Sequence, residues 1–155
     1  MRRLARTARL IVFFAGVLAA VPLFAADATL ELRHFAEAAG VTDVEGFIET
    51  VETLRGSGHL PARYVSKRRA RELGWRPGAD LCRLTAGDAL GGDRFNDRGH
   101  ALPRAAGRRW READLDERCA VGRGTHRLLW SSDGLIYVTT DHYRTFVAVP
   151  APAPR

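Results

Sequence analysis

The sequence lacks the signature motifs of several large enzyme classes. It contains no glycine-rich loop followed by Lys-Ser or Lys-Thr, no His-Glu-x-x-His pair, and no Gly-x-Ser-x-Gly nucleophile elbow. The Gly91-Gly92-Asp93 segment also lacks the strand-to-helix setting of a dinucleotide fingerprint. These absences argue against a P-loop NTPase, a zinc protease, a serine hydrolase and a dinucleotide-dependent enzyme.

Lysine and cysteine are scarce as well. Lys67 is the one lysine among 24 Lys and Arg residues, and the chain has two cysteines and no internal repeat. A length of 155 residues excludes a large multidomain enzyme. The hydrophobic fraction of 46% and the charged fraction of 27% argue against global disorder, so we expect one folded domain.

Long hydrophobic runs are missing except at Leu10 to Phe24, near the N-terminus. Four arginines precede this run, and Ala26-Asp27-Ala28 follows it. We predict a secretory signal peptide over residues 1–28, cleaved after Ala28, with export to the medium or to a periplasm. The alternative is a retained membrane anchor, for which the run is shorter than the ~20 residues of a span. Cleavage would lower the formal charge from +6 to +3.

Export makes the two cysteines informative. In an oxidising compartment, Cys82 and Cys119 are expected to form one disulfide, with a stabilisation of roughly 4 kcal/mol in the chain-entropy picture. Two unpaired buried thiols are the alternative. A zinc site is disfavoured because neither cysteine has a second Cys or a His two to four residues away.

Apolar spacing predicts helices in the first half of the chain. Residues 29–41 form a weakly amphipathic N-terminal extension, which we interpret as a short helix. A helix over residues 43–55 is predicted to be capped by Thr42 with Glu45, and its inward face holds Phe47, Ile48, Val51 and Leu54. A second, short helix follows Ser66, with Ala70 and Leu73 inward and Gly74 at its end.

The second half has the pattern of strands. Residues 87–107 have loop composition with brief extended pieces, whereas residues 127–130, 135–140 and 144–149 are short runs rich in β-branched and aromatic residues. Together these runs predict an antiparallel meander, with residues 150–155 as a flexible tail. Helices first and strands later predict an α+β fold, in which N-terminal helices pack on one face of a C-terminal antiparallel β-sheet.

Glu112 and His142 are the residues best suited to acid and base chemistry. A carboxylate and an imidazole on separate segments of one sheet can act as a general base and a general acid. A solvent-facing Glu and an ordinary turn His explain the same spacing. Positive charge near these segments suits a phosphate, although a solvated basic surface would look the same; it comes from Lys67, Arg98, Arg111, Arg123 and Arg127.

The order of several longer motifs is more specific than any of these patterns. They are Leu60-Pro61 with Tyr64 and Lys67, Leu73-Gly74-Trp75, Gly91-Gly92-Asp93-Arg94-Phe95, the segment 107–114, the segment 127–133 and the segment 135–146. In this order they resemble the secreted bacterial ribonucleases typified by barnase. The resemblance covers residues 42–149, which we take as the ribonuclease domain.

The resemblance implies a barnase-like microbial ribonuclease fold and an enzyme without metal or cofactor. Such an endoribonuclease cleaves single-stranded RNA by transesterification to a 2′,3′-cyclic phosphate and then hydrolyses this ester. Glu112 stands at the position of the general base and His142 at that of the general acid. Three residues match the cations that hold the scissile phosphate, namely Lys67, Arg123 and Arg127. Tyr143 matches a residue that contacts the substrate.

Three charged residues fit structural roles better than catalytic ones: Asp93, Asp114 and Arg108. Asp114 is two residues from Glu112, so on a strand it shares the same face and can orient Arg123 and Arg127. Arg108 is expected to pair with Asp133.

The base-recognition loop departs from the family pattern. Phe95, Asn96, Asp97 and Arg98 keep the spacing of that loop, but Gly99 stands where the family has a glutamate that accepts hydrogen bonds from guanine. We expect either a weakened guanine preference or the acceptor role taken over by Asp97. One residue is also inserted between Leu115 and Arg123, and the two cysteines are an addition to the family's archetype.

The resemblance also implies partners. The substrate is single-stranded RNA, the chain is expected to be monomeric without stable membrane association after signal cleavage, and a barstar-like protein inhibitor would protect its producer. An alternative from another class is an RNA-binding domain, or an effector domain in bacterial competition, that has lost turnover. Intact Glu112, His142, Lys67 and Arg127 favour the enzyme.

Overall fold

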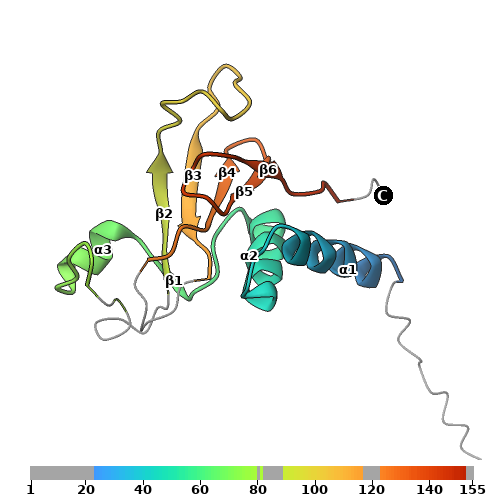
Figure 1. Cartoon of the computed structure of the whole chain (residues 1–155), viewed down its shortest axis with the longest axis horizontal. Coiled ribbons are helices and arrows are strands. Elements are labelled where there is room, and N and C mark those ends of the chain that lie inside the picture. The colour runs from blue at the N-terminus through green and yellow to red at the C-terminus, as the bar shows by residue number, and fades with distance from the viewer. Residues whose placement is uncertain (1–22, 80, 82–88, 117–122, 153–155) are drawn as a thin grey trace, which may run out of the picture.

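The computed structural model describes residues 23–79, 81, 89–116 and 123–152, with side chains from residue 27 onward. Within these ranges three helices and six strands follow one another along the chain (Figure 1). The elements are α1 (Leu23–Ala38), α2 (Val44–Ser57), β1 (Tyr64–Val65), α3 (Lys67–Glu72), β2 (Ala89–Phe95), β3 (Trp110–Asp114), β4 (Arg127–Ser131), β5 (Ile136–Thr139) and β6 (Val147–Ala148). None of the described helices is long and apolar enough to cross a membrane.

The strands form one sheet in which sequence order and spatial order agree, from β1 to β6. Only β1 and β2 pair in parallel; every later pair is antiparallel. Helices α1 and α2 lie together beside one side of this sheet (Figure 1). The largest core cluster joins them to Leu128 and Val138 of the central strands. The predicted α+β fold, with N-terminal helices on one face of an antiparallel sheet, is confirmed.

Helix α1 is part of the main core. It begins at Leu23 and ends at Ala38, so the predicted span of residues 29–41 began too late and ended too late. Leu32 and Ala36 are buried, and the Phe35 ring stacks on Phe47 of α2 with 5.8 Å between centroids. Both buried residues follow the predicted cleavage site at Ala28, so cleavage there would shorten α1 and keep its core contacts.

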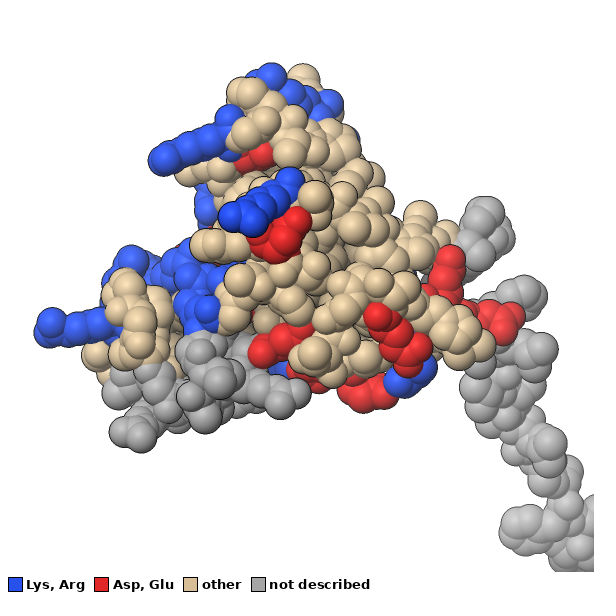
Figure 2. Space-filling view, viewed as in Figure 1, with Lys and Arg blue, Asp and Glu red and all other residues tan. Residues whose placement is uncertain are grey.

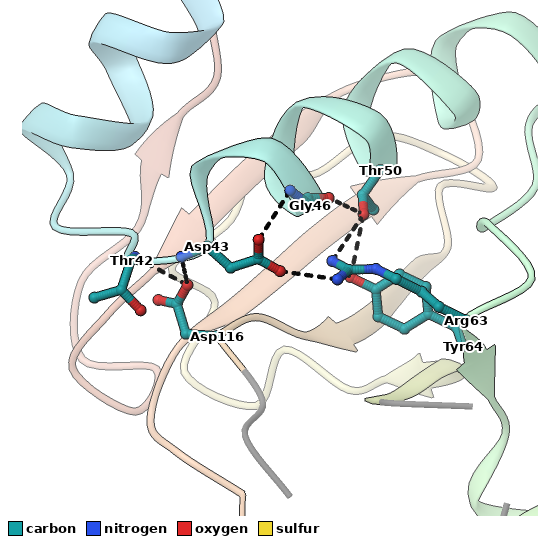
Figure 3. A network of polar contacts seen from close by, with 7 residues as sticks. All are labelled: Thr42, Asp43, Gly46, Thr50, Arg63, Tyr64 and Asp116. Carbon is teal, nitrogen blue, oxygen red and sulfur yellow. Dashed lines mark hydrogen bonds and ion pairs between the residues drawn. The ribbon is translucent and has the colours of Figure 1, made fainter. Parts of the chain in front are cut away.

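Helix α2 buries the four apolar residues predicted from its spacing, but its cap differs from the prediction. Asp43, rather than Thr42, accepts the N–H of Gly46 at 3.0 Å. The backbone N–H groups of Thr42 and Asp43 donate instead to Asp116, which follows β3 (Figure 3). The Thr42–Glu45 capping box is therefore not formed, because a distant carboxylate takes over the amide of Thr42.

A second set of bonds joins α2 to the chain before β1. Arg63 donates to the Asp43 carboxylate at 2.8 Å and to the Tyr64 hydroxyl at 3.1 Å, and Thr50 lies 3.2 Å from the same hydroxyl (Figure 3). A side chain on Gly46 would overlap this network, since its Cβ would lie 2.2 Å from an Asp43 oxygen and 2.6 Å from the Arg63 guanidinium. A side chain at residue 46 would therefore require the ends of the Asp43 and Arg63 side chains to shift.

Helix α3 begins as predicted, with the Ser66 side chain accepting the N–H of Arg69. Ala70 is fully buried, but Leu73 is 38% exposed, so its predicted inward orientation was wrong. The helix ends before Leu73, and the chain turns at Gly74 so that Trp75 fills the inward position instead.

Residues 87–107, predicted to be a loop with brief extended pieces, contain the seven-residue strand β2, which is longer than expected. Its glycines and aspartate are poor strand formers, but β2 pairs with β1 on one side and β3 on the other, and this pairing outweighs local preference. A Cβ on Gly91 would lie within 3.0 Å of Leu60, Tyr64 and Ala113. The glycine that weakens the local signal is thus required by close packing.

Candidate active site

The alternation of side chains along β3 separates the functional residues from the core that faces the helices. Glu112 pairs with Leu129 and Asp114 with Arg127, and these residues share the sheet face opposite the helices. Arg111 and Ala113 lie on the helix face. Arg111 therefore points away from Glu112, and it donates to the Gly92 carbonyl at 2.5 Å. The phosphate contact considered for Arg111 is not supported.

The Glu112 carboxylate is held by one partner on each oxygen. Its side chain is 10% exposed; Lys67 Nζ lies 2.5 Å from Oε1, and the Tyr143 hydroxyl donates to Oε2 at 2.8 Å. Lys67 reaches this point because it is the first residue of α3, and its backbone N–H donates to Asp93 of β2 at 2.9 Å. Asp93 thus has the structural role expected for it.

Tyr143 remains a hydrogen-bond donor over the whole physiological range. Burial and the neighbouring carboxylate of Glu112 raise the pKa of Tyr143 to about 12. Its ring lies over the Arg127 guanidinium, with 6.0 Å from Cζ to the ring centroid. The Tyr143 phenol therefore stays protonated, bonds the carboxylate and lies against a buried cation.

Asp114 organises the two arginines predicted to hold the phosphate. Arg123 donates to both carboxylate oxygens, through Nε and Nη2 at 2.6 Å each, and Arg127 Nε lies 3.0 Å from Oδ1. The hydrogen bonds to Asp114 raise the pKa of Arg123 above its ordinary value. Asp114 and Arg127 are almost fully buried. The predicted orienting role of Asp114 agrees with this geometry, and the residue inserted before Arg123 does not separate the two arginines.

His142 lies on the turn that follows β5. The rings of His142 and Tyr143 are 5.2 Å apart, and both residues have positive φ angles, 59° and 69°. His142 is exposed, and its ring forms no hydrogen bond with any described residue. Tyr143 connects the two predicted acid–base residues, because its hydroxyl donates to Glu112 and its ring lies next to that of His142.

Asp141 shapes this turn; the sequence predicted that it lies in a turn, but not that its side chain holds the turn together. Its Oδ1 accepts from the Thr139 hydroxyl and from the N–H groups of Arg144 and Thr145, and its Oδ2 accepts from the Thr145 hydroxyl. The bonds from Thr145 hold the pKa of Asp141 well below its ordinary value. An aspartate four residues before a threonine in a predicted turn was the signal that could have revealed it.

The base-recognition loop begins next to this turn. The Phe95 ring stacks on Tyr143 at 5.2 Å. Asp97 uses both carboxylate oxygens within the loop, because they accept the N–H groups of Ala101 at 3.1 Å and Leu102 at 2.9 Å. Asn96 and Arg98 are exposed on the same loop.

Two further predictions concern charged or reactive pairs. Arg108 donates to both oxygens of Asp133, at 2.6 to 3.0 Å, as expected. Cys82 and Cys119 lie outside the described residues, so their disulfide stays a prediction. Among the residues that the structure describes, no three His, Cys, Asp or Glu side chains gather in a way that could hold a metal ion.

The similarity to known proteins agrees with this geometry. Residues 49–150 match the model of a family described as ribonuclease. The chain is 45% identical over 91 residues to a ribonuclease from Heyndrickxia coagulans, a match that covers 58% of this chain and 83% of that protein. Ribonucleases from Bacillus intermedius and Bacillus pumilus match at the same identity over the same share of this chain, but the match spans only 56% of their length. Because the family match covers more than half of the sequence, the chain belongs to the barnase-type family of bacterial ribonucleases.

Proposed function

We propose that the protein cleaves single-stranded RNA by transesterification without a metal ion and then hydrolyses the 2′,3′-cyclic phosphate. Membership of the ribonuclease family makes the chain an endoribonuclease. The observation that carries the proposed mechanism is the enclosed Glu112 carboxylate, bonded by Lys67 and Tyr143 while His142 is exposed on the adjoining turn.

In the proposed first step, Glu112 takes the proton of the ribose 2′-hydroxyl. The 2′-oxygen forms a bond to phosphorus as the bond between phosphorus and the 5′-oxygen breaks, and His142 donates a proton to that oxygen. In the second step water attacks the cyclic ester, and the two residues exchange roles. DNA is not a substrate because it has no 2′-hydroxyl.

Electrostatics supports a phosphate at this place. Lys67, Arg123 and Arg127 bring three positive charges together, against the carboxylates of Glu112, of Asp114 and of Asp93, which lies opposite Glu112 in the sheet. Arg123 is held by two hydrogen bonds to Asp114, and Arg127 by its ion pair with Asp114 and a hydrogen bond to the His126 carbonyl. Both guanidinium groups therefore need little reorganisation as negative charge grows on the phosphate.

Digestion of a defined RNA in EDTA tests the mechanism, with mass spectrometry of the products. We expect a 2′,3′-cyclic phosphate, and we expect Glu112→Gln and His142→Ala each to lower the rate by ~10²–10⁴-fold. His34→Ala, on the exposed surface of α1, is the matched control. Loss of cleavage in the chelator would refute metal independence, and absence of cleavage in any buffer would leave an RNA-binding domain.

We also propose that guanine preference is weaker than in relatives that carry the glutamate. Asp97 is occupied by two backbone N–H groups, which argues against its use as the missing acceptor. A Cβ on Gly99 would meet nothing within 4 Å, so the glutamate can be introduced without a clash. Gly99→Glu is expected to raise the ratio of GpN to ApN cleavage, whereas Gly99→Gln, which lacks the carboxylate, is expected to raise it less. A high ratio in the unmodified protein would contradict this proposal.

Export and inhibition complete the proposal. The basic, arginine-rich segment before the apolar run supports secretion with cleavage after Ala28, and the cationic site supports a protective inhibitor with an acidic surface. The mass of the protein recovered from the medium of its host tests the first point; an intact N-terminus would contradict cleavage.

A further inference from the structure

A concave site lies at the loop between β2 and β3. Its cavity of about 330 Å³ has Phe95, Asn96 and Asp97 on one side and the returning half of the loop on the other. Four of its lining residues define the arginine pocket: Arg94, Arg104, Arg108 and Arg109. The described residues that line it do not include Glu112 or His142, so this cavity is separate from the candidate active site.

The charge of the arginine pocket is poorly compensated. Arg108 is bound to Asp133, but Arg94, Arg104 and Arg109 are exposed and form no ion pair or side-chain hydrogen bond with any described residue. Asp97 is the one carboxylate in the wall. Both of its oxygens already accept backbone N–H groups of the loop. Three guanidinium groups therefore share one hollow with a single carboxylate, Asp97, which is already bonded to the loop backbone.

Such an arrangement favours a phosphate. Like charges along a concave wall add their potentials and concentrate anions, and each planar guanidinium can donate two parallel hydrogen bonds to phosphate oxygens. We propose that the arginine pocket binds a phosphate of the RNA strand other than the scissile one. This inference rests on the proposed RNA substrate.

The position of the pocket favours a strand over a small anion. Phe95, Asn96 and Asp97 belong both to its wall and to the loop predicted to contact the base. A strand whose base lies on that loop brings its neighbouring phosphates to the other side of the same few residues. Figure 2 shows Lys and Arg atoms gathered over the β2–β3 loop, which carries the pocket.

Binding of an uncleavable oligonucleotide tests the inference without any need for turnover. We would measure the affinity of a labelled 2′-O-methyl 12-mer by fluorescence anisotropy at several salt concentrations. Arg104→Gln/Arg109→Gln is expected to weaken binding at least fivefold at low salt. It should also flatten the plot of log Kd against log salt by about 0.7 for each phosphate that the variant no longer neutralises. Cleavage of a dinucleotide, which has one phosphate, is expected to stay unchanged.

The matched control is Arg71→Gln/Arg76→Gln, which removes the same charge from two exposed arginines outside the pocket. Equally weakened binding in both double variants would overturn the inference, because it would show general electrostatics. Unchanged affinity in Arg104→Gln/Arg109→Gln would also overturn it. The inference would also be overturned if calorimetry showed inorganic phosphate in the pocket while Arg104→Gln/Arg109→Gln left the affinity for the 12-mer unchanged. If the unmodified protein cleaves no RNA, the binding data still decide whether the pocket takes a strand.

Discussion

Asp114 offers the sharpest test of how the site is held together. Its side chain is 1% exposed, and it lies between Arg123, which is 27% exposed, and Arg127, which is 4% exposed. In Asp114→Asn the shape of the side chain is kept and its charge is removed. Arg123 can turn towards water, but Arg127 cannot leave the protein interior without a larger rearrangement.

The loss of stability expected for Asp114→Asn follows from this difference between Arg123 and Arg127. Removal of one partner from a buried ion pair leaves an uncompensated charge, which destabilises a protein by about 3–5 kcal/mol. The amide oxygen of asparagine can still accept one hydrogen bond, so we expect the free energy of unfolding to fall by about 3 kcal/mol, the lower end of that range. Urea denaturation would show it as a lower midpoint with an unchanged slope.

Two further variants test whether the unpaired charge of Arg127 causes the loss of stability. Arg127→Met in the Asp114→Asn background removes that charge with an apolar side chain of similar length, so it is expected to recover part of the stability. Asp133→Asn breaks the ion pair between Asp133 and Arg108 at an exposed place, where water replaces the lost partner. Its effect on the free energy of unfolding is expected to be much smaller. A destabilisation below about 1 kcal/mol in Asp114→Asn, or no recovery in the double variant, would refute the reasoning.

Two other predictions concern the attachment of α2. Burial disfavours ionisation of Asp116, but the N–H groups of Asp43 and Thr42 and the His126 ring outweigh it, so the pKa of Asp116 lies below its ordinary value. A lowered pKa in the folded state stabilises the fold above the unfolded pKa of about 3.9. This stability is lost as the pH falls through the folded pKa. Asp116→Asn is therefore expected to be less stable than the parent at pH 6, with a gap in urea midpoint that narrows towards pH 3; a constant gap would contradict the assignment. Gly46→Ala is expected to cost about 1–3 kcal/mol because its Cβ would overlap Asp43 and Arg63. Gly56→Ala, on the same helix with nothing within 4 Å of its Cβ, is expected to gain about 0.5–1 kcal/mol. Thermal unfolding of the pair measures both, and equal effects would show that packing at residue 46 is not the cause.

The elements that were predictable are those in which one local pattern decides the structure. The inward face of α2 follows from helical spacing, since Phe47, Ile48, Val51 and Leu54 recur at three- and four-residue intervals and are all buried. The pairing of Asp114 with Arg127 follows from strand alternation, which puts Glu112 and Asp114 on one face.

The remaining features depend on contacts between distant parts of the chain. Thr42 has the sequence of a cap, yet its amide is taken by Asp116, 74 residues away. Gly91 weakens every local indication of a strand, although contact with Leu60 and Tyr64 requires it. Tyr143 bonds Glu112 across 31 residues, so no spacing rule could have paired them. Local preference is overruled in each case by a tertiary contact.

The distribution of charge ties the fold to the proposed function. Residues 23–57, which contain α1 and α2, hold seven Asp and Glu against two Arg, whereas residues 58–155 hold eighteen Lys and Arg against eleven Asp and Glu. Figure 2 shows the acidic atoms mainly over α1 and α2, and the basic atoms over α3 and the β2–β3 loop. The net charge of +3 expected after the proposed signal cleavage understates this separation. A polyanion is repelled by the helical layer and attracted to the other end of the molecule, so the separation favours productive orientation during encounter. Because salt screens such fields within about 10 Å at 0.1 M, the benefit is greatest at low ionic strength.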